Sequence, residues 1–295
     1  MALTSIGAFP ATPGCALVSE QEEGPYYVDD ETLRRNITEG KPGVPLQLAL
    51  MLVDAKTCRP LSNVALDIWH CDATGVYSGF TAVSPDGGPG GPGRPGGGRG
   101  RGPGGPPPPF DGGCGGFGPG GPGGPGGPGS PGGRGSREID PTRFLRGVQL
   151  SDGSGRVEFT TLYPGWYSGR AIHIHVKAHV GGTSDQKDAA KYAGGHVAHT
   201  GQLFFPEDLT ERIARLEPYA KRLAVHRTTQ AEDQVFNGQG PDVMLTTERL
   251  GKTDSEGFRA TATLAVDPEA TPAPVGGGGS GGRGRGRGPG GPPTP

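Results

Sequence analysis

The chain has 295 residues, a formal net charge of -2, and 59 glycine and 32 proline residues. This charge gives no reason to expect nucleic acid or an anionic membrane as the main partner, and no apolar run is long enough to span a bilayer. The amino terminus lacks a basic region followed by a sustained apolar stretch, so it does not predict a secretory signal. The compartment stays open between the cytoplasm and an exported protein whose signal is absent from this chain.

Glycine and proline are concentrated in an insert at 85–137 and in a tail at 272–295. Both segments have almost nothing to bury, which predicts disorder. Their Arg-Gly repeats resemble RNA-binding tracts, but a solvated spacer is the preferred interpretation because charge is sparse and aromatic residues are few. The roughly 200 residues that remain are enough for one sizeable core.

Short β-prone runs separated by turn residues begin the ordered part of the chain. Residues 44–53 alternate apolar side chains and lead through a polar loop to 64–71, which predicts a hairpin. Residues 144–150 and 156–162 are joined by Ser-Asp-Gly-Ser-Gly, which predicts a second hairpin. Strands are expected next at 171–180 and 201–205.

The last part of the chain combines a helix with a further hairpin. Asp208 is expected to cap a helix that places Leu209, Ile213 and Leu216 on one face and ends before Pro218. A final hairpin is predicted to pair strands at 243–250 and 258–266. Many short strands, hairpin turns and one short helix together favour a mainly β fold, an antiparallel β-sandwich core with a long disordered insert.

The segment from Tyr163 to Lys177 carries most of the chemistry. Side chains on a strand repeat with period two, so His173 and His175 project from the same face as a chelating pair. Pro164-Gly165 is a turn that can bring Tyr167 back toward that pair, and histidines with phenolates suit a ferric ion. Taken alone, the same pattern fits equally well a half-exposed strand with polar outward positions.

The four cysteines, Cys15, Cys58, Cys71 and Cys114, allow three full pairings and match no zinc pattern. Cys58 and Cys71 flank one predicted strand, which keeps them too far apart to bridge easily. A bond from Cys15 to either of them is more favourable. Free buried thiols are an equal alternative in a reducing compartment.

Five separated motifs occur in one order along the chain and together carry a specific signal. They are Glu23-Gly-Pro-Tyr-Tyr27, Gly43-Val-Pro-Leu46, Asp67 to Gly79, Phe144-Leu-Arg-Gly147 and Tyr163 to Lys177. Together they resemble the intradiol ring-cleavage dioxygenases, the family of catechol and protocatechuate dioxygenases, and most of all its single-domain, often secreted branch. The resemblance implies one β-sandwich domain at 15–267, interrupted by the insert, with a flexible amino terminus at 1–14 and a disordered tail at 268–295.

Members of this family hold a non-haem Fe(III) ion. Matched motif by motif, the resemblance implies the metal ligands Tyr77, Tyr167, His173 and His175. Tyr167 falls at the position of the axial ligand that can dissociate, and Tyr77 at that of the tyrosine that stays bound. Arg170 matches a catalytic arginine that stabilises anionic intermediates, and Gln202 matches a glutamine that orients substrate or oxygen.

The implied reaction inserts both atoms of O2 into a small catechol substrate and gives a muconate-type diacid. Two features depart from the family pattern. The insert begins soon after Tyr77, and deletion of 85–137 is expected to leave iron binding intact. The amino-terminal helical dimerisation region of the catechol dioxygenase branch is missing, so that mode of assembly is not expected. The sequence indicates neither which catechol is used nor the oligomeric state.

Two other functions compete with the dioxygenase. A non-catalytic β-sandwich module could bind aryl or polysaccharide ligands, but such a binder has no need of two phenolate ligands. A cupin-like oxygenase could hold Fe(II) or copper on the His-x-His pair, but it would require a third histidine at cupin spacing. The complete ligand set therefore favours the dioxygenase.

Overall fold

The computed structural model describes residues 15–29, 32–86, 139–184, 190–239 and 244–275. The flexible amino terminus predicted for 1–14 lies outside these ranges, as does Cys114. The disorder predicted for the insert and the tail concerns mostly 87–137 and 276–295, which also lie outside the described residues. No helix in the described ranges is long and apolar enough to cross a membrane.

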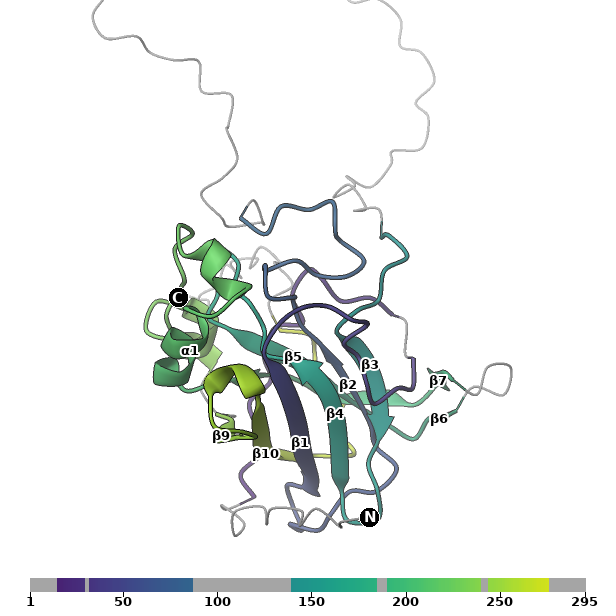
Figure 1. The fold of residues 1–295 in the computed structure, drawn as a ribbon. Coiled ribbons are helices and arrows are strands. Elements are labelled where there is room, and N and C mark those ends of the chain that lie inside the picture. The colour runs from purple at the N-terminus through teal and green to yellow at the C-terminus, as the bar shows by residue number, and fades with distance from the viewer. Residues whose placement is uncertain (1–14, 30–31, 87–138, 185–189, 240–243, 276–295) are drawn as a thin grey trace, which may run out of the picture.

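Two four-stranded sheets form the body of the molecule, and Figure 1 shows them packed face to face. The strands are β1 (Pro45–Asp54), β2 (Ala65–Trp69), β3 (Arg146–Leu150), β4 (Arg156–Leu162), β5 (His173–Val180), β8 (His196–Phe204), β9 (Thr246–Arg249) and β10 (Phe258–Val266). One sheet has the order β4-β1-β10-β9 and the other β3-β2-β5-β8. A separate two-stranded ribbon pairs β6 (Thr183–Ser184) with β7 (Tyr192–Ala193). The predicted mainly β class is confirmed.

The core lies between the two sheets, where alternate side chains of facing strands meet. On β1, Leu46, Leu48, Leu50 and Leu52 point inward and are at most 1% exposed. From the opposite sheet, apolar residues such as Ile174 join the same cluster. This period-two pattern is the one that predicted the strands, because one face of each strand must be apolar to fill a sandwich.

Strand pairing differs from the prediction in three places. Strands β1 and β2 lie in different sheets, and so do β3 and β4, so both predicted hairpins of these pairs are wrong. A turn signal indicates that the chain reverses, but both sheets offer an apolar inner face, so the reversal can cross the core to the other sheet. The first sheet is also mixed, because β1 runs parallel to β10. The last hairpin, β9 with β10, is antiparallel as predicted.

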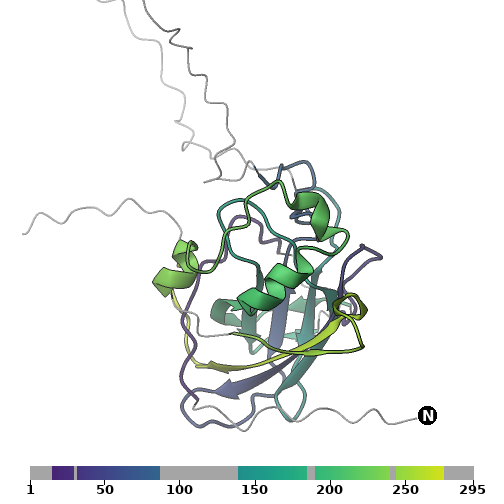
Figure 2. The same ribbon diagram turned by 60° about the vertical axis from the view of Figure 1, so that its left-hand side comes forward.

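The helical segments lie beside the sheets and not between them (Figures 1 and 2). Helix α1 spans Glu207–Ile213 with Leu209 and Ile213 buried, as predicted, but it ends before Leu216 and so is shorter than the predicted helix. The cap prediction was wrong, because Pro206 occupies the N-cap and Asp208 lies within the first turn, where a carboxylate still interacts favourably with the helix dipole. Three further elements were not predicted from the sequence: α2 (Gln234–Gln239) and the 3-10 turns Tyr219–Arg222 and Asp254–Glu256.

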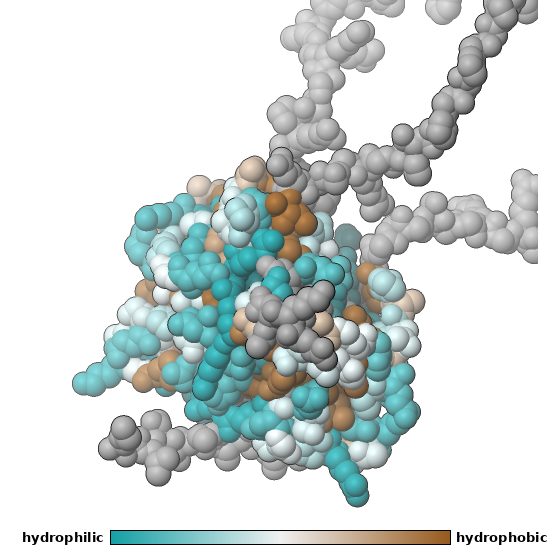
Figure 3. All heavy atoms as spheres, turned by 90° about the vertical axis from the view of Figure 1, so that its right-hand side faces the viewer, coloured by the Kyte–Doolittle hydropathy of each residue, from teal (hydrophilic) through white to brown (hydrophobic). Residues whose placement is uncertain are grey.

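A disulfide joins Cys15 to Cys58, with their Cα atoms 5.5 Å apart, and Cys71 is a buried free thiol. Of the alternatives left open by the spacing, the structure therefore has the bond from Cys15 to the loop after β1. This bond holds the start of the amino-terminal segment, which crosses the outer face of the sheet β3-β2-β5-β8. The visible surface in Figure 3 is mostly hydrophilic, with small hydrophobic areas separated by polar ones.

Candidate active site

Strand β5 carries a row of polar side chains that are buried on the outer face of its sheet. His173, His175 and Lys177 alternate along this row and are 1–5% exposed. In the register of the sheet, His175 lies opposite Trp69 of β2 and Gln202 of β8. The indole of Trp69 stacks on the His175 imidazole with ring centroids 4.8 Å apart and planes 3° from parallel. We call this outer face of β3-β2-β5-β8 the site face.

The two imidazoles converge, as the period-two pattern predicted. Their Nε2 atoms lie 3.0 Å apart. Nδ1 of His173 donates to the Ala171 carbonyl at 2.6 Å, which leaves Nε2 as the atom with a lone pair on the site side. Burial lowers the pKa of both imidazoles, so both are neutral at physiological pH, the form that ligates metal ions.

Tyr167 reaches the histidines from the loop before β5. Its hydroxyl donates to Nε2 of His173 at 3.3 Å. The turn that brings it there requires Gly165, because a Cβ at this position would lie 2.5 Å from the Ala73 carbonyl oxygen. The predicted return of the chain through Pro164-Gly165 therefore depends on a close approach between two backbones.

Tyr77 approaches the same point from the loop after β2. The Asp72 carboxylate organises this loop by accepting the backbone N–H groups of Thr74 at 2.9 Å and Val76 at 3.1 Å. The Tyr77 ring lies 5.7 Å from that of Tyr167 and 6.3 Å from that of His175. Its hydroxyl is buried, and it makes no hydrogen bond of regular geometry within the described part of the chain. Burial, and next the neighbouring Tyr167 phenol, raises the pKa of Tyr77 well above its ordinary value.

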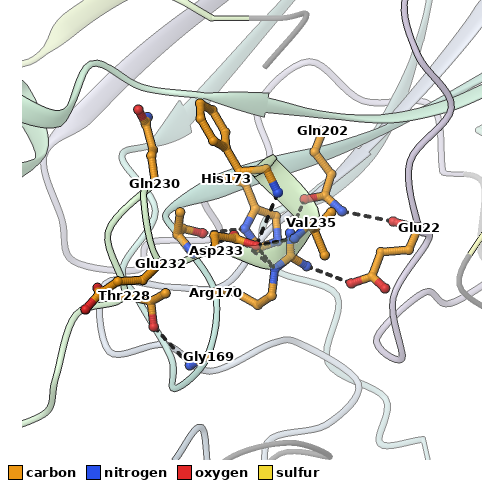
Figure 4. A network of polar contacts seen from close by, with 12 residues as sticks. Glu22, Gly169, Arg170, His173, Gln202, Thr228, Gln230, Glu232, Asp233 and Val235 are labelled. Atoms are coloured by element: carbon orange, nitrogen blue, oxygen red, sulfur yellow. Dashed lines mark hydrogen bonds and ion pairs between the residues drawn. The ribbon is translucent and has the colours of Figure 1, made fainter. Parts of the chain in front are cut away.

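Arg170 lies at the centre of a polar network beside the two histidines (Figure 4). Its Nε donates to the Asp233 carboxylate at 3.1 and 3.2 Å, and its Nη1 donates to Glu22 at 2.9 Å. Its Nη2 donates to Oε1 of Gln202 at 2.5 Å, and Nε2 of Gln202 donates in turn to the Glu22 carbonyl at 3.0 Å. The two polar residues assigned from motifs are thus in direct contact with each other.

Asp233 is a residue of this site that the sequence analysis missed. Its side chain is fully buried, and besides Arg170 it accepts the backbone N–H groups of Ala171 at 2.8 Å and Val235 at 2.8 Å. It therefore joins the start of β5 to the first turn of α2. The available signal was an aspartate directly before a short helix, but that helix lacks the apolar periodicity that would have predicted it.

The amino-terminal segment around the motif Glu23–Tyr27 covers the site. The Tyr26 ring stacks on that of Tyr77 with centroids 4.5 Å apart and planes 16° from parallel. Gly24 has a φ of 76°, and a Cβ there would lie 3.2 Å from Cε1 of His175. The buried guanidinium of Arg146 donates to the Tyr26 carbonyl at 2.6 Å and so holds this turn in place.

Two other histidines near these motifs, His70 and His199, make structural contacts. His70 is buried beside the core, where Nδ1 donates to the Cys71 carbonyl at 2.8 Å and Nε2 accepts from Thr161 Oγ1 at 2.7 Å. Both ring nitrogens of His70 are therefore used in packing contacts away from the site. His199 contacts the Glu20 carboxylate at 2.5 Å, which ties the amino-terminal segment to β8.

The donor atoms fit a ferric ion. The two histidines and the two tyrosines predicted as ligands converge in one buried place, and they come from three segments of the chain. Two imidazole nitrogens and two phenol oxygens form a set of hard and intermediate donors that suits Fe(III). Within the described residues no group of three or more His, Cys, Asp or Glu side chains could hold a metal ion, and the two phenols are the further donors beside the imidazoles.

The structure is similar to solved dioxygenases. An intradiol ring-cleavage dioxygenase from Tetranychus urticae matches with a TM-score of 0.62 and 27% sequence identity over 88% of this chain and 98% of that chain. A second dioxygenase structure matches with a TM-score of 0.60 at the same identity and coverage. No model of a protein family and no curated protein matches the sequence. The resemblance inferred from the motifs is confirmed by these structural matches, which cover most of the chain.

Proposed function

We propose that this chain, which has the fold of the intradiol ring-cleavage dioxygenases, is a non-haem iron(III) enzyme. Its reaction is the cleavage of a catechol between the two hydroxylated carbons, with insertion of both atoms of O2, to a muconate-type diacid. The observation that carries the proposal is the buried convergence of Tyr77, Tyr167, His173 and His175. A binding module would gain nothing from burying two phenols and two neutral imidazoles against one another.

The four donors differ in what they need before they can bind a cation. Both imidazoles are already neutral, whereas burial raises the pKa of Tyr167 and Tyr77, so each phenol keeps its proton. When bound, the ferric ion supplies Lewis acidity that lowers the pKa of its phenol ligands and draws electron density from a bound catecholate. Tyr167 already shares its proton with His173 Nε2, and the nearby Arg170 lowers the pKa of this phenol against the effect of burial. Once bound to the metal as a phenolate, Tyr167, which lies between His173 and Arg170, is the ligand we assign to accept a substrate proton.

Arg170 and Gln202 supply the polar groups next to the metal ligands. Burial lowers the pKa of Arg170, but Tyr167, Asp233 and Glu22 more than offset this and hold it charged. A fixed, planar cation in a site with little water stabilises negative charge that develops on a reacting ring. Gln202 contacts this guanidinium and lies opposite His175, so it can orient substrate or oxygen at the same place.

The test is the visible absorption spectrum of purified protein with its iron content, before and after anaerobic addition of catechol. We expect a red-brown tyrosinate-to-iron(III) charge-transfer band that shifts when catechol binds, followed by oxygen uptake and formation of a muconate when air is admitted. The double variant Y77F/Y167F removes both phenol oxygens at almost constant volume and should be colourless. Wild-type protein that stays colourless after reconstitution with iron would contradict the proposal and favour a binding module.

A further inference from the structure

Arg170 is flanked by two carboxylates. Asp233 binds Nε at 3.1 Å and Glu22 binds Nη1 at 2.9 Å. The two acids reach the guanidinium from opposite sides (Figure 4). With both acids ionised, these three side chains carry a net charge of -1, although Arg170 alone would make this part of the site positive.

The two carboxylates lie at different depths. The side chain of Asp233 is 0% exposed, that of Arg170 13% and that of Glu22 28%. Asp233 also accepts two backbone N–H groups, so its negative charge is stabilised by groups inside the protein. Glu22 is therefore the acid of this group that a molecule entering from solvent meets.

The position of Glu22 is fixed by its neighbours along the chain. Gln202 donates to the main-chain carbonyl of Glu22 at 3.0 Å. Glu20 accepts the backbone N–H of Thr200 at 3.0 Å, and Glu23 pairs with Lys177, whose charge is thereby compensated. These contacts hold the main chain around Glu22, and the ion pair with Arg170 holds its carboxylate at the edge of the site.

We infer that Glu22 is a specificity-determining residue that disfavours catechols bearing a carboxylate, so the substrate class is neutral catechols and catechols bearing an ammonium group. This rests on the proposed function. Two like charges repel with an energy that varies inversely with distance and with the local dielectric constant, and a partly exposed group in a cleft retains part of that effect. A neutral catechol avoids the repulsion, and an ammonium group on the substrate gains attraction instead.

The test compares catechol, 3,4-dihydroxybenzoate and dopamine as substrates of the iron-loaded protein, with anaerobic dissociation constants measured in parallel. We expect wild type to prefer catechol over 3,4-dihydroxybenzoate in both measurements. E22Q keeps a hydrogen-bond acceptor for Arg170 but loses the charge, so it should improve the relative kcat/KM for 3,4-dihydroxybenzoate by about threefold to tenfold. The control E248Q makes the same charge change on exposed β9 and should leave the ratio as in wild type.

Salt separates the charge of Glu22 from a purely structural role. Raising the ionic strength should weaken the wild-type preference and have little effect on E22Q. If wild type cleaves catechol but uses 3,4-dihydroxybenzoate equally well, or if E22Q keeps the wild-type ratio, the role of Glu22 is refuted while the dioxygenase function stands. If no catechol is cleaved by iron-loaded wild type, the proposed function fails and this inference fails with it.

Discussion

The outer faces of the two sheets are built from similar strands but are used in opposite ways. On the outer face of the sheet β4-β1-β10-β9, the polar side chains Gln47 and Thr160 are exposed, and Glu158 lies among partly exposed arginines. On the site face the outward row of β5 is just as polar, yet His173 and His175 are at most 2% exposed. Buried polar side chains need hydrogen-bond partners. At the site face these partners come from loops and from the amino-terminal segment.

The difference shows where a sandwich can carry chemistry. Alternation of apolar and polar residues makes one face of a strand suitable for the core on either sheet. What distinguishes the site face is the second layer of chain over it, which excludes water from the imidazoles and phenols and shifts their pKa values. Four changes, from the largest expected effect to the smallest, test this contrast.

The largest effect is expected from H175A, which removes one donor from the buried row. Iron content and catechol cleavage should both fall by about 100-fold or more, since even residues that only support metal ligands cost 10- to 100-fold when removed. Metal analysis of purified protein and an oxygen-uptake assay measure the two effects. Q47A, on the exposed face, is the matched control and should retain iron. Full iron content in H175A would show that the row does not hold the metal.

The next effect is expected from D233A, which leaves the buried guanidinium of Arg170 without its main partner. Breaking a buried ion pair on one side costs about 3–5 kcal/mol in the free energy of unfolding, to be measured by chemical denaturation. The reaction rate should fall as well, because Arg170 loses the contact that orients it, while iron content stays close to wild type. Loss of iron with unchanged stability would instead place Asp233 in the metal site.

A smaller effect is expected on the pH dependence of stability from His70. Burial lowers the pKa of this histidine to about 4. In the unfolded state the pKa of His70 is near 6.5. Between pH 6.5 and 4 the unfolded state therefore binds a proton at this residue that the folded state does not, and the free energy of unfolding falls as the pH drops through this range. This residue should account for about 3 kcal/mol of that fall. H70Q should flatten the pH dependence of unfolding, whereas H226Q, at an exposed histidine, should not. An unchanged slope in H70Q would show that His70 is not neutral in the fold.

The smallest effect is expected from E158Q on the exposed face. Glu158 contacts Arg35, Arg156 and Arg259, but such partly exposed pairs each contribute little because water screens them. The free energy of unfolding should change by less than about 1 kcal/mol, and iron content should not change. If E158Q lowered the free energy of unfolding as much as D233A, the exposed face would be as important for stability as the site face, and the contrast drawn here would be wrong.

The strands and the family resemblance were predictable from sequence, and the connections between strands were not. The alternation in 44–53 and the pair His173 and His175 depend only on local periodicity, which a strand preserves. The sheet that β2 joins after the loop from β1 depends on contacts with strands distant in the sequence, and local periodicity does not predict these contacts. Asp233 and Glu22 were missed for a related reason, because each acts through Arg170 from a distant part of the chain.

The bond between Cys15 and Cys58 has a practical consequence for anyone who produces this protein. It joins two positions separated by 43 in the sequence, and the loop so closed contains the covering segment with Glu22, Gly24 and Tyr26. Material made in a reducing host is expected to lack this tether and to hold the segment by ion pairs and hydrogen bonds alone. Preparations of equal purity would then differ in how firmly this segment covers the site, so a thiol count belongs beside any metal analysis of a batch.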